Sequence, residues 1–157
     1  QQVQLSSAYG RLKVTHRFRM EERFIAKMGP SPDDPTQGMF ERYTYQNRFR
    51  YRVWLTLPLG REKVEPGVFS ANLYEELFIN FGDSQRTDYV NQNRISALLG
   101  YQVSTPFSVL AGYLYQVIQR PGAANGADLL ELNSTLHLAL VYNADLRKKG
   151  TTAPTKP

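Results

Sequence analysis

From residue 11 to residue 142 the chain alternates apolar and polar side chains in about six long runs, and this two-residue period constrains its fold more than any other feature. Such a period is that of a β-strand whose two faces differ in chemistry. In the first run Leu12 and Phe18 fall on one face, and Arg17 falls on the other. The sequence therefore predicts an all-β protein with one apolar and one charged face.

Residues typical of turns divide the alternating part into six expected strands. Their ranges are 11–27, 40–57, 68–81, 89–103, 107–120 and 129–143. Loops are expected at 28–35, which holds three prolines, at 60–67, and at the turn signals Gly82-Asp83-Ser84 and Pro121-Gly122. The expected strands are far longer than the usual five or six residues, and a membrane-spanning strand needs about 9 to 11. Long loops alternate with short turns, an asymmetry typical of outer-membrane barrels.

The fold predicted from these runs is an antiparallel transmembrane β-barrel, a meander of long hairpins. Six visible strands are fewer than the eight of the smallest common barrels, so we expect eight or more in the complete barrel. Either residues 2–9 supply another strand, or N-terminal strands are missing, or another chain completes the barrel. The expected organisation is an N-terminal segment or partial strand at 1–10, a barrel domain at 11–146 and a disordered basic tail at 147–157.

Composition permits this fold. The aromatic fraction is 12%, with ten Tyr and eight Phe, which suits many positions at a membrane interface. Mean hydropathy is negative, but a barrel escapes that test because its strands alternate lipid-facing and lumen-facing residues. The absence of cysteine excludes disulfides and thiolate metal sites.

The polar face is predicted to fill the barrel lumen with a charge network, because opposite charges on neighbouring strands can pair across the sheet. Its expected members are Arg17, Arg19, Glu21, Arg23, Arg48, Arg50, Arg52, Glu76, Arg94, Glu131 and His137. A buried network of this kind is stable only when each member is satisfied. A soluble sandwich or lipocalin-like calyx would show the same alternation, but the charge density of the polar face favours the barrel.

The apolar face is predicted to meet lipid, with aromatic girdles towards the strand ends. The expected aromatic residues are Phe18, Phe24, Tyr43, Tyr45, Phe49, Tyr51, Tyr113, Tyr115 and Tyr142. Strict alternation also turns Glu22 and Glu75 towards lipid, which is costly near the bilayer centre. A β-bulge or a position above the membrane would relieve that cost.

Five segments together resemble an uncharacterised outer-membrane β-barrel family of Bacteroidota. They are residues 16–24 (HRFRMEERF), 47–52 (NRFRYR), 74–80 (YEELFIN), 92–94 (QNR) and 112–116 (GYLYQ). The resemblance runs from the first to the sixth expected strand and implies an exported envelope barrel with a charged interior and no assigned activity. Members of that family carry additional strands before the His-Arg-Phe segment, and their barrels commonly end in an aromatic residue, where this chain continues into a basic tail.

Candidate catalytic and ligand-binding residues are few. His137 with Ser108 and Glu131 forms the one loosely plausible hydrolase set, without a Gly-x-Ser-x-Gly motif to support it. Acids at 33–34, 83 and 88 could gather cations on outer loops, but solvated loop acids are expected and no metal-ligand spacing is present. Arginines and aromatics alternate at 48–52 and so project to opposite faces, which argues against a nucleic-acid platform.

The expected function is that of an outer-membrane β-barrel with a structural or accessory role in the cell envelope. A subunit of a larger assembly is one form of that role. The protein is not expected to be an enzyme or to need a cofactor. Its expected partners are outer-membrane lipid or lipopolysaccharide and other envelope proteins, with no nucleic acid. The alternatives are a narrow pore that favours anions, and, third, a soluble lipocalin-like binding protein or an outer-membrane hydrolase.

Overall fold

The computed structural model describes residues 1–30, 38–81, 90–120 and 129–143, and within them the chain forms seven strands and no helix. The strands are β1 (Gln2–Tyr9), β2 (Leu12–Pro30), β3 (Gly38–Pro58), β4 (Phe69–Phe81), β5 (Val90–Ser104), β6 (Phe107–Arg120) and β7 (Leu129–Tyr142). No helix in these ranges could cross a membrane. The expected tail at 147–157, the turn at 82–84 and the loop at 121–122 lie outside the described residues.

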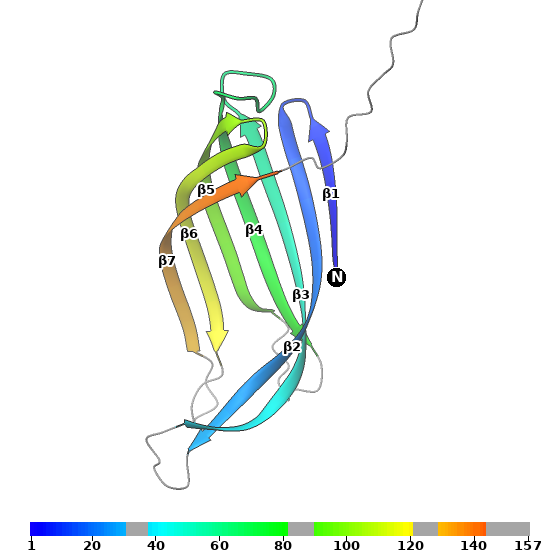
Figure 1. The fold of residues 1–157 in the computed structure, drawn as a ribbon, viewed down its shortest axis with the longest axis vertical. Coiled ribbons are helices and arrows are strands. Elements are labelled where there is room, and N and C mark those ends of the chain that lie inside the picture. Colours follow the sequence, from blue (N-terminus) through cyan, green and yellow to red (C-terminus); the bar gives the residue numbers. More distant parts are fainter. Residues whose placement is uncertain (31–37, 82–89, 121–128, 144–157) are drawn as a thin grey trace, which may run out of the picture.

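All seven strands belong to one antiparallel sheet in sequence order, β1 to β7 (Figure 1). The all-β antiparallel meander is thus confirmed, but within the described residues the sheet is not closed into a barrel, because β1 pairs with β2 alone and β7 with β6 alone. With seven antiparallel strands, β1 and β7 run in the same direction. Antiparallel closure would therefore need a further strand running the opposite way between them.

The six expected strands are all present, and residues 2–9 form a seventh, which was one of the three options open from the sequence. The expectation of a loop from residue 28 was wrong, because β2 continues to Pro30 and pairs Gly29 with Met39 and Pro30 with Gly38. The physical reason is that the N-terminal residues pair with β2 no further than Met20, whose N–H donates to Gln1 O at 2.9 Å. Beyond that point β2 is an edge strand, where a proline without an N–H is tolerated.

The register keeps two chemically different faces aligned across the whole sheet. One row on the enclosed face is polar on every strand: Gln4, Arg17, Arg52, Glu76, Arg94, Gln116 and Asn133. The adjacent row on the other face is mostly apolar: Val3, Phe18, Tyr51, Leu77, Asn93, Val117 and Leu132. Glu76 is 3% exposed, whereas Leu136 is 87% exposed. Charged side chains are therefore enclosed while leucines are exposed, the reverse of a water-soluble domain.

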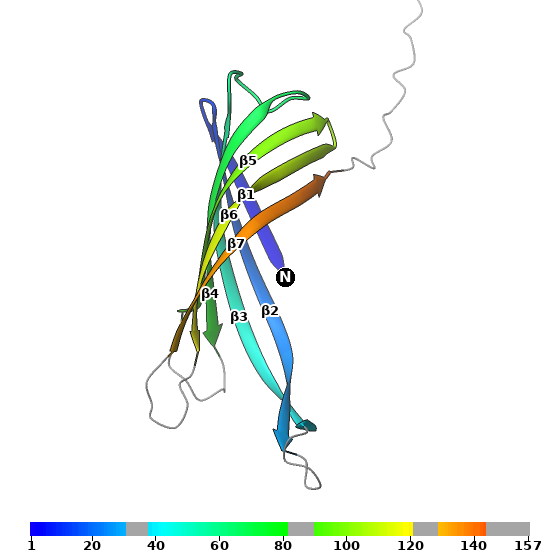
Figure 2. The same cartoon turned by 90° about the vertical axis from the view of Figure 1, so that its left-hand side faces the viewer.

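The sheet curls around its polar face, which is concave, and β5 to β7 bend most strongly near the tight β5–β6 turn (Figure 2). Two glycines on the concave side permit this bend. A Cβ built on Gly112 would collide with the backbone of Ala97 and Leu98, and one on Gly100 would lie 2.7 Å from the Ser70 hydroxyl. Glycine is thus the residue that lets neighbouring strands approach this closely.

Two segments extend the sheet at its opposite ends. At one end the β3–β4 turn is tied to β5, since the N–H of Gly67 donates to Gln102 O at 2.7 Å and that of Gln102 donates to Val68 O at 3.1 Å. At the other end β2 and β3 project beyond their neighbours as a two-stranded ribbon, because β4 pairs with β3 only from Asn47 onwards (Figure 1). The concave face between these ends holds the candidate site.

Candidate functional site on the concave face

Two glutamates organise an ion-pair network in the middle of the concave face. Glu76, from the centre of β4, accepts hydrogen bonds from Arg17 at 2.5 Å and from Arg50 at 3.0 Å. Arg50 also donates to Glu21 at 2.7 Å, and Arg19 lies 3.5 Å from the same carboxylate. Arg17 on β2 reaches across β3 to meet Glu76 on β4, which is possible because the sheet is curved towards this face.

The remaining arginines of the predicted network have no such partner among the described residues. Within the described ranges, Arg23, Arg48, Arg52 and Arg94 make no ion pair with a carboxylate. Arg48 donates to Asn80 at 3.0 Å and Arg94 donates to Gln116 at 2.8 Å. The eleven predicted network residues include seven arginines and three glutamates, so the concave face keeps an excess of positive charge.

Phe78 separates several of these cations. Its ring is 2% exposed, and the guanidinium carbons of Arg48, Arg50 and Arg94 lie 5.6, 4.6 and 4.8 Å from its centroid. Cation–π attraction to the ring face offsets part of the repulsion between like charges. This role was not predictable from the alternating pattern, because Phe78 falls on the polar face of its strand; an aromatic residue at a polar position is the signal that could have revealed it.

The other predicted network residues lie on the same face but away from the glutamate-centred pairs. Arg23 donates to Gln46 at 3.4 Å where the projecting ribbon begins. Glu131, near the start of β7, accepts from Arg120 and, at 2.8 Å, from Asn133. The structure therefore places the predicted residues on one face but divides them into separate groups.

The candidate hydrolase set is not brought together. His137 is in register with Gly112, whereas Ser108 is in register with Val141, four residues further along β7, and Glu131 lies six residues away in the other direction. The Nδ1 of His137 instead lies 3.1 Å from the hydroxyl of Ser96. Register therefore does not support this set, because residues on the same face of neighbouring strands can lie several positions apart.

A cavity of about 780 Å³ occupies the turn end of the concave face. Its cationic side carries Lys13 from β2 and Arg52 from β3, and Trp54 and Tyr74 stack in its lining with ring centroids 4.8 Å apart. A volume of this size lies in the range of small-molecule sites, about 300 to 1,000 Å³.

The opposite side of the cavity carries an aliphatic patch that the alternating pattern did not predict. The patch consists of Leu110 from β6, which belongs to the core cluster with Tyr74 and Leu98, and of Ala139 and Val141 from β7, which pack against that cluster; Ser108 and His137 line the same side. The signal was present in the sequence as a local loss of alternation. Residues 97–99, 109–111 and 138–141 are apolar at every position, so these strands are apolar on both faces there.

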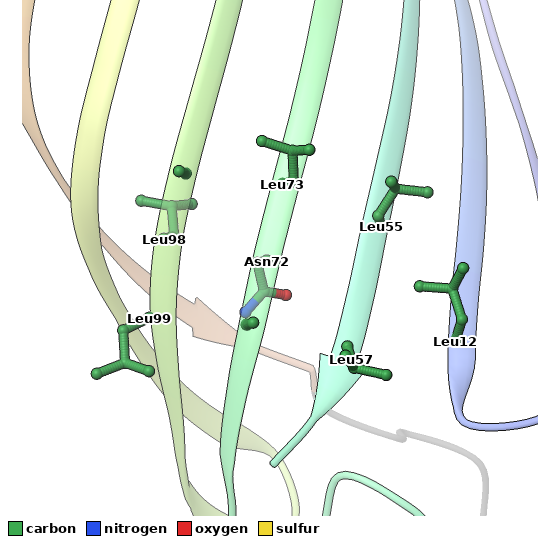
Figure 3. Close-up of a pocket in the computed structure, with 9 residues that line it drawn as sticks. Leu12, Leu55, Leu57, Asn72, Leu73, Leu98 and Leu99 are labelled. Carbon is green, nitrogen blue, oxygen red and sulfur yellow. The ribbon is translucent and has the colours of Figure 1, made fainter.

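The convex face carries all nine predicted aromatic residues by register. Six lie over the seven-stranded part, while Phe24, Tyr43 and Tyr45 lie on the projecting ribbon, where Phe24 contacts Tyr45 at a centroid distance of 5.3 Å. A hollow of about 520 Å³ is lined by leucines from four neighbouring strands (Figure 3). The labelled leucines of this face are Leu12, Leu55, Leu57, Leu73 and Leu99.

Two polar pairs interrupt the convex face. Glu75 accepts a hydrogen bond from the amide of Asn93 at 2.9 Å, and the Nδ1 of His16 lies 2.8 Å from the hydroxyl of Tyr51. The bulge considered for Glu75 is not there, since the register irregularity of β4 falls between Phe78 and Ile79. Glu22 lies on β2, beyond the last residue of that strand that pairs with β1.

No cluster of three or more metal-ligating side chains occurs in the part of the chain that the structure describes. The loop acids at 33–34, 83 and 88 fall outside that part.

Fold and site together define a class of protein: an open antiparallel meander with an enclosed, arginine-rich face and an exposed apolar face. Residues 1–127 match the profile of a family described as "protein of unknown function (DUF2490)", and the chain belongs to that family. The searches of curated proteins and of solved structures each found no significant match. The resemblance to an uncharacterised family is thus confirmed, while its outer-membrane nature and its bacterial phylum stay predictions.

Proposed function

We propose that this protein is an outer-membrane β-barrel with a structural or accessory role in the cell envelope and no enzymatic activity. The observation that carries the proposal is the inverted polarity of the sheet. Glu76 and Ser96 are almost fully enclosed, while Leu132, Leu136, Leu138 and Leu140 are each more than 60% exposed. In water such a continuous apolar surface would favour aggregation, whereas hydrocarbon is its natural solvent.

The hairpin geometry supports the same proposal. The described turns after β1, β3 and β5 lie at one end of the sheet, and two of them are tight, at Gly10-Arg11 and Thr105-Pro106. Short turns at one end are typical of the periplasmic side of such barrels. Lipid acyl chains would cover the leucines of the convex face, and lipopolysaccharide or other envelope proteins would be the neighbours.

Closure is the remaining requirement of the proposal. Since β1 and β7 run in the same direction and neither pairs with a described residue on its outer edge, a complete barrel needs at least one strand of opposite direction between them, from this protein or from a partner. The resulting barrel would have eight strands or more.

Heat-modifiable migration tests this proposal. The protein, folded in detergent or lipid, is run on a denaturing gel with and without boiling, and circular dichroism is recorded on the same sample. We expect a β-rich species whose mobility changes on boiling, as closed barrels show. A β-rich protein that stays monomeric in buffer without detergent would contradict the membrane assignment and favour a calyx.

A narrow anion-favouring pore is the second candidate, and a specific observation favours it. Arg48, Arg52 and Arg94 are left without a carboxylate partner in the described part of the concave face. Rings and clusters of arginine select anions in pores. Single-channel conductance in a planar bilayer would show a chloride-over-potassium preference, and a protein that forms closed barrels without conductance would exclude this candidate.

A further inference from the structure

The cavity at the turn end combines a cationic side with an aliphatic patch, and Glu65 of the β3–β4 turn, Ser108 and His137 also line it. Lys13 and Arg52 bring positive charge from β2 and β3, and Leu110, Ala139 and Val141 bring aliphatic surface from β6 and β7. An inorganic anion would leave the aliphatic side without a partner, and a neutral hydrocarbon would leave Arg52 without one. A ligand that satisfies both sides must carry a negative charge at one end and an apolar body at the other.

Arg52 is the group that such a charge would meet. Its guanidinium lies over the rings of Trp54 and Tyr74, at 5.0 and 5.7 Å from their centroids. Its Nε is buried and has no hydrogen-bond partner among the described residues. Glu76, which is in register with Arg52, is engaged by Arg17 and Arg50. No hydrogen bond joins Arg52 to another described residue, so the part of the guanidinium that lines the cavity has donors left for an anionic ligand.

The floor of the cavity is held in place by contacts that leave the arginine free. The indole N–H of Trp54 donates to the Thr56 hydroxyl at 3.0 Å and to Asn72 Oδ1 at 3.2 Å. The Tyr74 ring stacks on the indole with an interplanar angle of 13°. The rings therefore present Arg52 to the cavity from a fixed position, which reduces the entropy lost on binding.

We propose that this cavity binds an amphiphilic organic anion with one hydrocarbon chain, such as a free fatty acid or a monoalkyl phosphate. The carboxylate or phosphate contacts Arg52 within the field of Lys13, and the hydrocarbon lies against Leu110, Ala139 and Val141. This assignment deepens the proposed function by naming a ligand for the lumen. It rests on the concave face alone and would hold for a calyx as well as for a barrel.

Trp54 is the single tryptophan of the chain and lies in the site, so its fluorescence reports binding directly. The protein, embedded in zwitterionic phosphatidylcholine nanodiscs, is titrated with octanoate, octyl phosphate, octanol and octyltrimethylammonium. The same titrations are made on Arg52→Gln and on Arg120→Gln, which removes an equal charge from the concave face near the other end of β6. The probes partition equally into the bilayer of all three samples, so differences in binding between the three proteins come from the site.

We expect saturable changes in Trp54 fluorescence with octanoate and octyl phosphate. The affinity should fall at least about tenfold in Arg52→Gln and stay unchanged in Arg120→Gln. The neutral and cationic probes should give no saturable change. Equal responses of the three proteins to octanoate, or equal responses to the four probes, would overturn the assignment. A saturable response to octyl phosphate alone would narrow the headgroup to phosphate and support the site.

Gel mobility of the same nanodisc samples separates this proposal from the proposed function. Heat-modifiable protein without octanoate binding refutes the ligand site and leaves the barrel intact. Arg52-dependent binding by protein that remains outside the nanodiscs and shows no heat modification supports the ligand site while refuting the membrane assignment.

Discussion

Arg50 and Arg52 are two residues apart on the same face of β3, yet their surroundings differ. Arg50 bridges two carboxylates, Glu21 at 2.7 Å and Glu76 at 3.0 Å. Arg52 faces the turn-end cavity over Trp54 and has no carboxylate partner in the described ranges. The same residue type in the same alternating pattern is thus a structural cation in one half of the concave face and a free binding group in the other.

The largest effect on stability is expected from Arg50→Ala, which removes the arginine that joins Glu21 and Glu76 in the paired half of the concave face. It would leave Glu21 and Glu76 short of a partner in an enclosed place, and breaking a buried pair costs about 3 to 5 kcal/mol. Urea unfolding of the lipid-embedded protein measures the change. Arg120→Ala is the matched control: its exposed pair with Glu131 should leave the midpoint almost unmoved. Equal midpoints for wild type and Arg50→Ala would show that Arg50 is solvated.

Gly112→Ala should have the next largest effect and should act on the cavity half. The new methyl group would collide with the backbone of β5, and overpacking of this kind costs about 1 to 3 kcal/mol. The matched control is Gly38→Ala, whose Cβ would meet Met28 at an ordinary 3.7 Å. A shift in Trp54 emission that accompanies the loss of stability would place the disturbance in the cavity. Identical unfolding of the two variants would mean that the bend does not depend on Gly112.

The smallest effect on stability is expected from Arg52→Gln. The variant loses cation–π contacts with Trp54 and Tyr74, which contribute about 0.5 to 2 kcal/mol each, but it is relieved of repulsion from neighbouring arginines. The two effects oppose each other, so the urea midpoint should stay close to that of the wild type. A loss as large as that of Arg50→Ala would remove the distinction between the two halves.

Much of the fold was predictable because alternation is a local property. Each strand shows its own two-residue period, so the positions of six strands and the two parities followed from the residues between Leu12 and Tyr142. The short strand β1 was less visible, since Gln2, Gln4, Ser6 and Ser7 give it little apolar contrast. The extension of β2 to Pro30 was missed because proline is compatible with a strand only at an edge, and edges are set by neighbours.

The candidate site was predictable only as a set of residues on one face. Parity places Arg17, Arg50 and Arg52 together, but it does not say which of them meets a glutamate. Arg17 pairs with Glu76 two strands away, a contact that depends on the curvature of the sheet. Register likewise keeps His137 and Ser108 apart, although both lie on the polar face.

The sequence by itself determined the all-β meander, the long strands and the separation of charge from hydrocarbon onto two faces, because these depend on each residue and its near neighbours along the chain. The tertiary structure alone decided the register, the bend at Gly100 and Gly112, the division of the arginines into paired and unpaired groups, and the meeting of apolar residues of β6 and β7 at the cavity. These features depend on residues from three or more strands meeting in space, and no period along a single strand encodes that meeting.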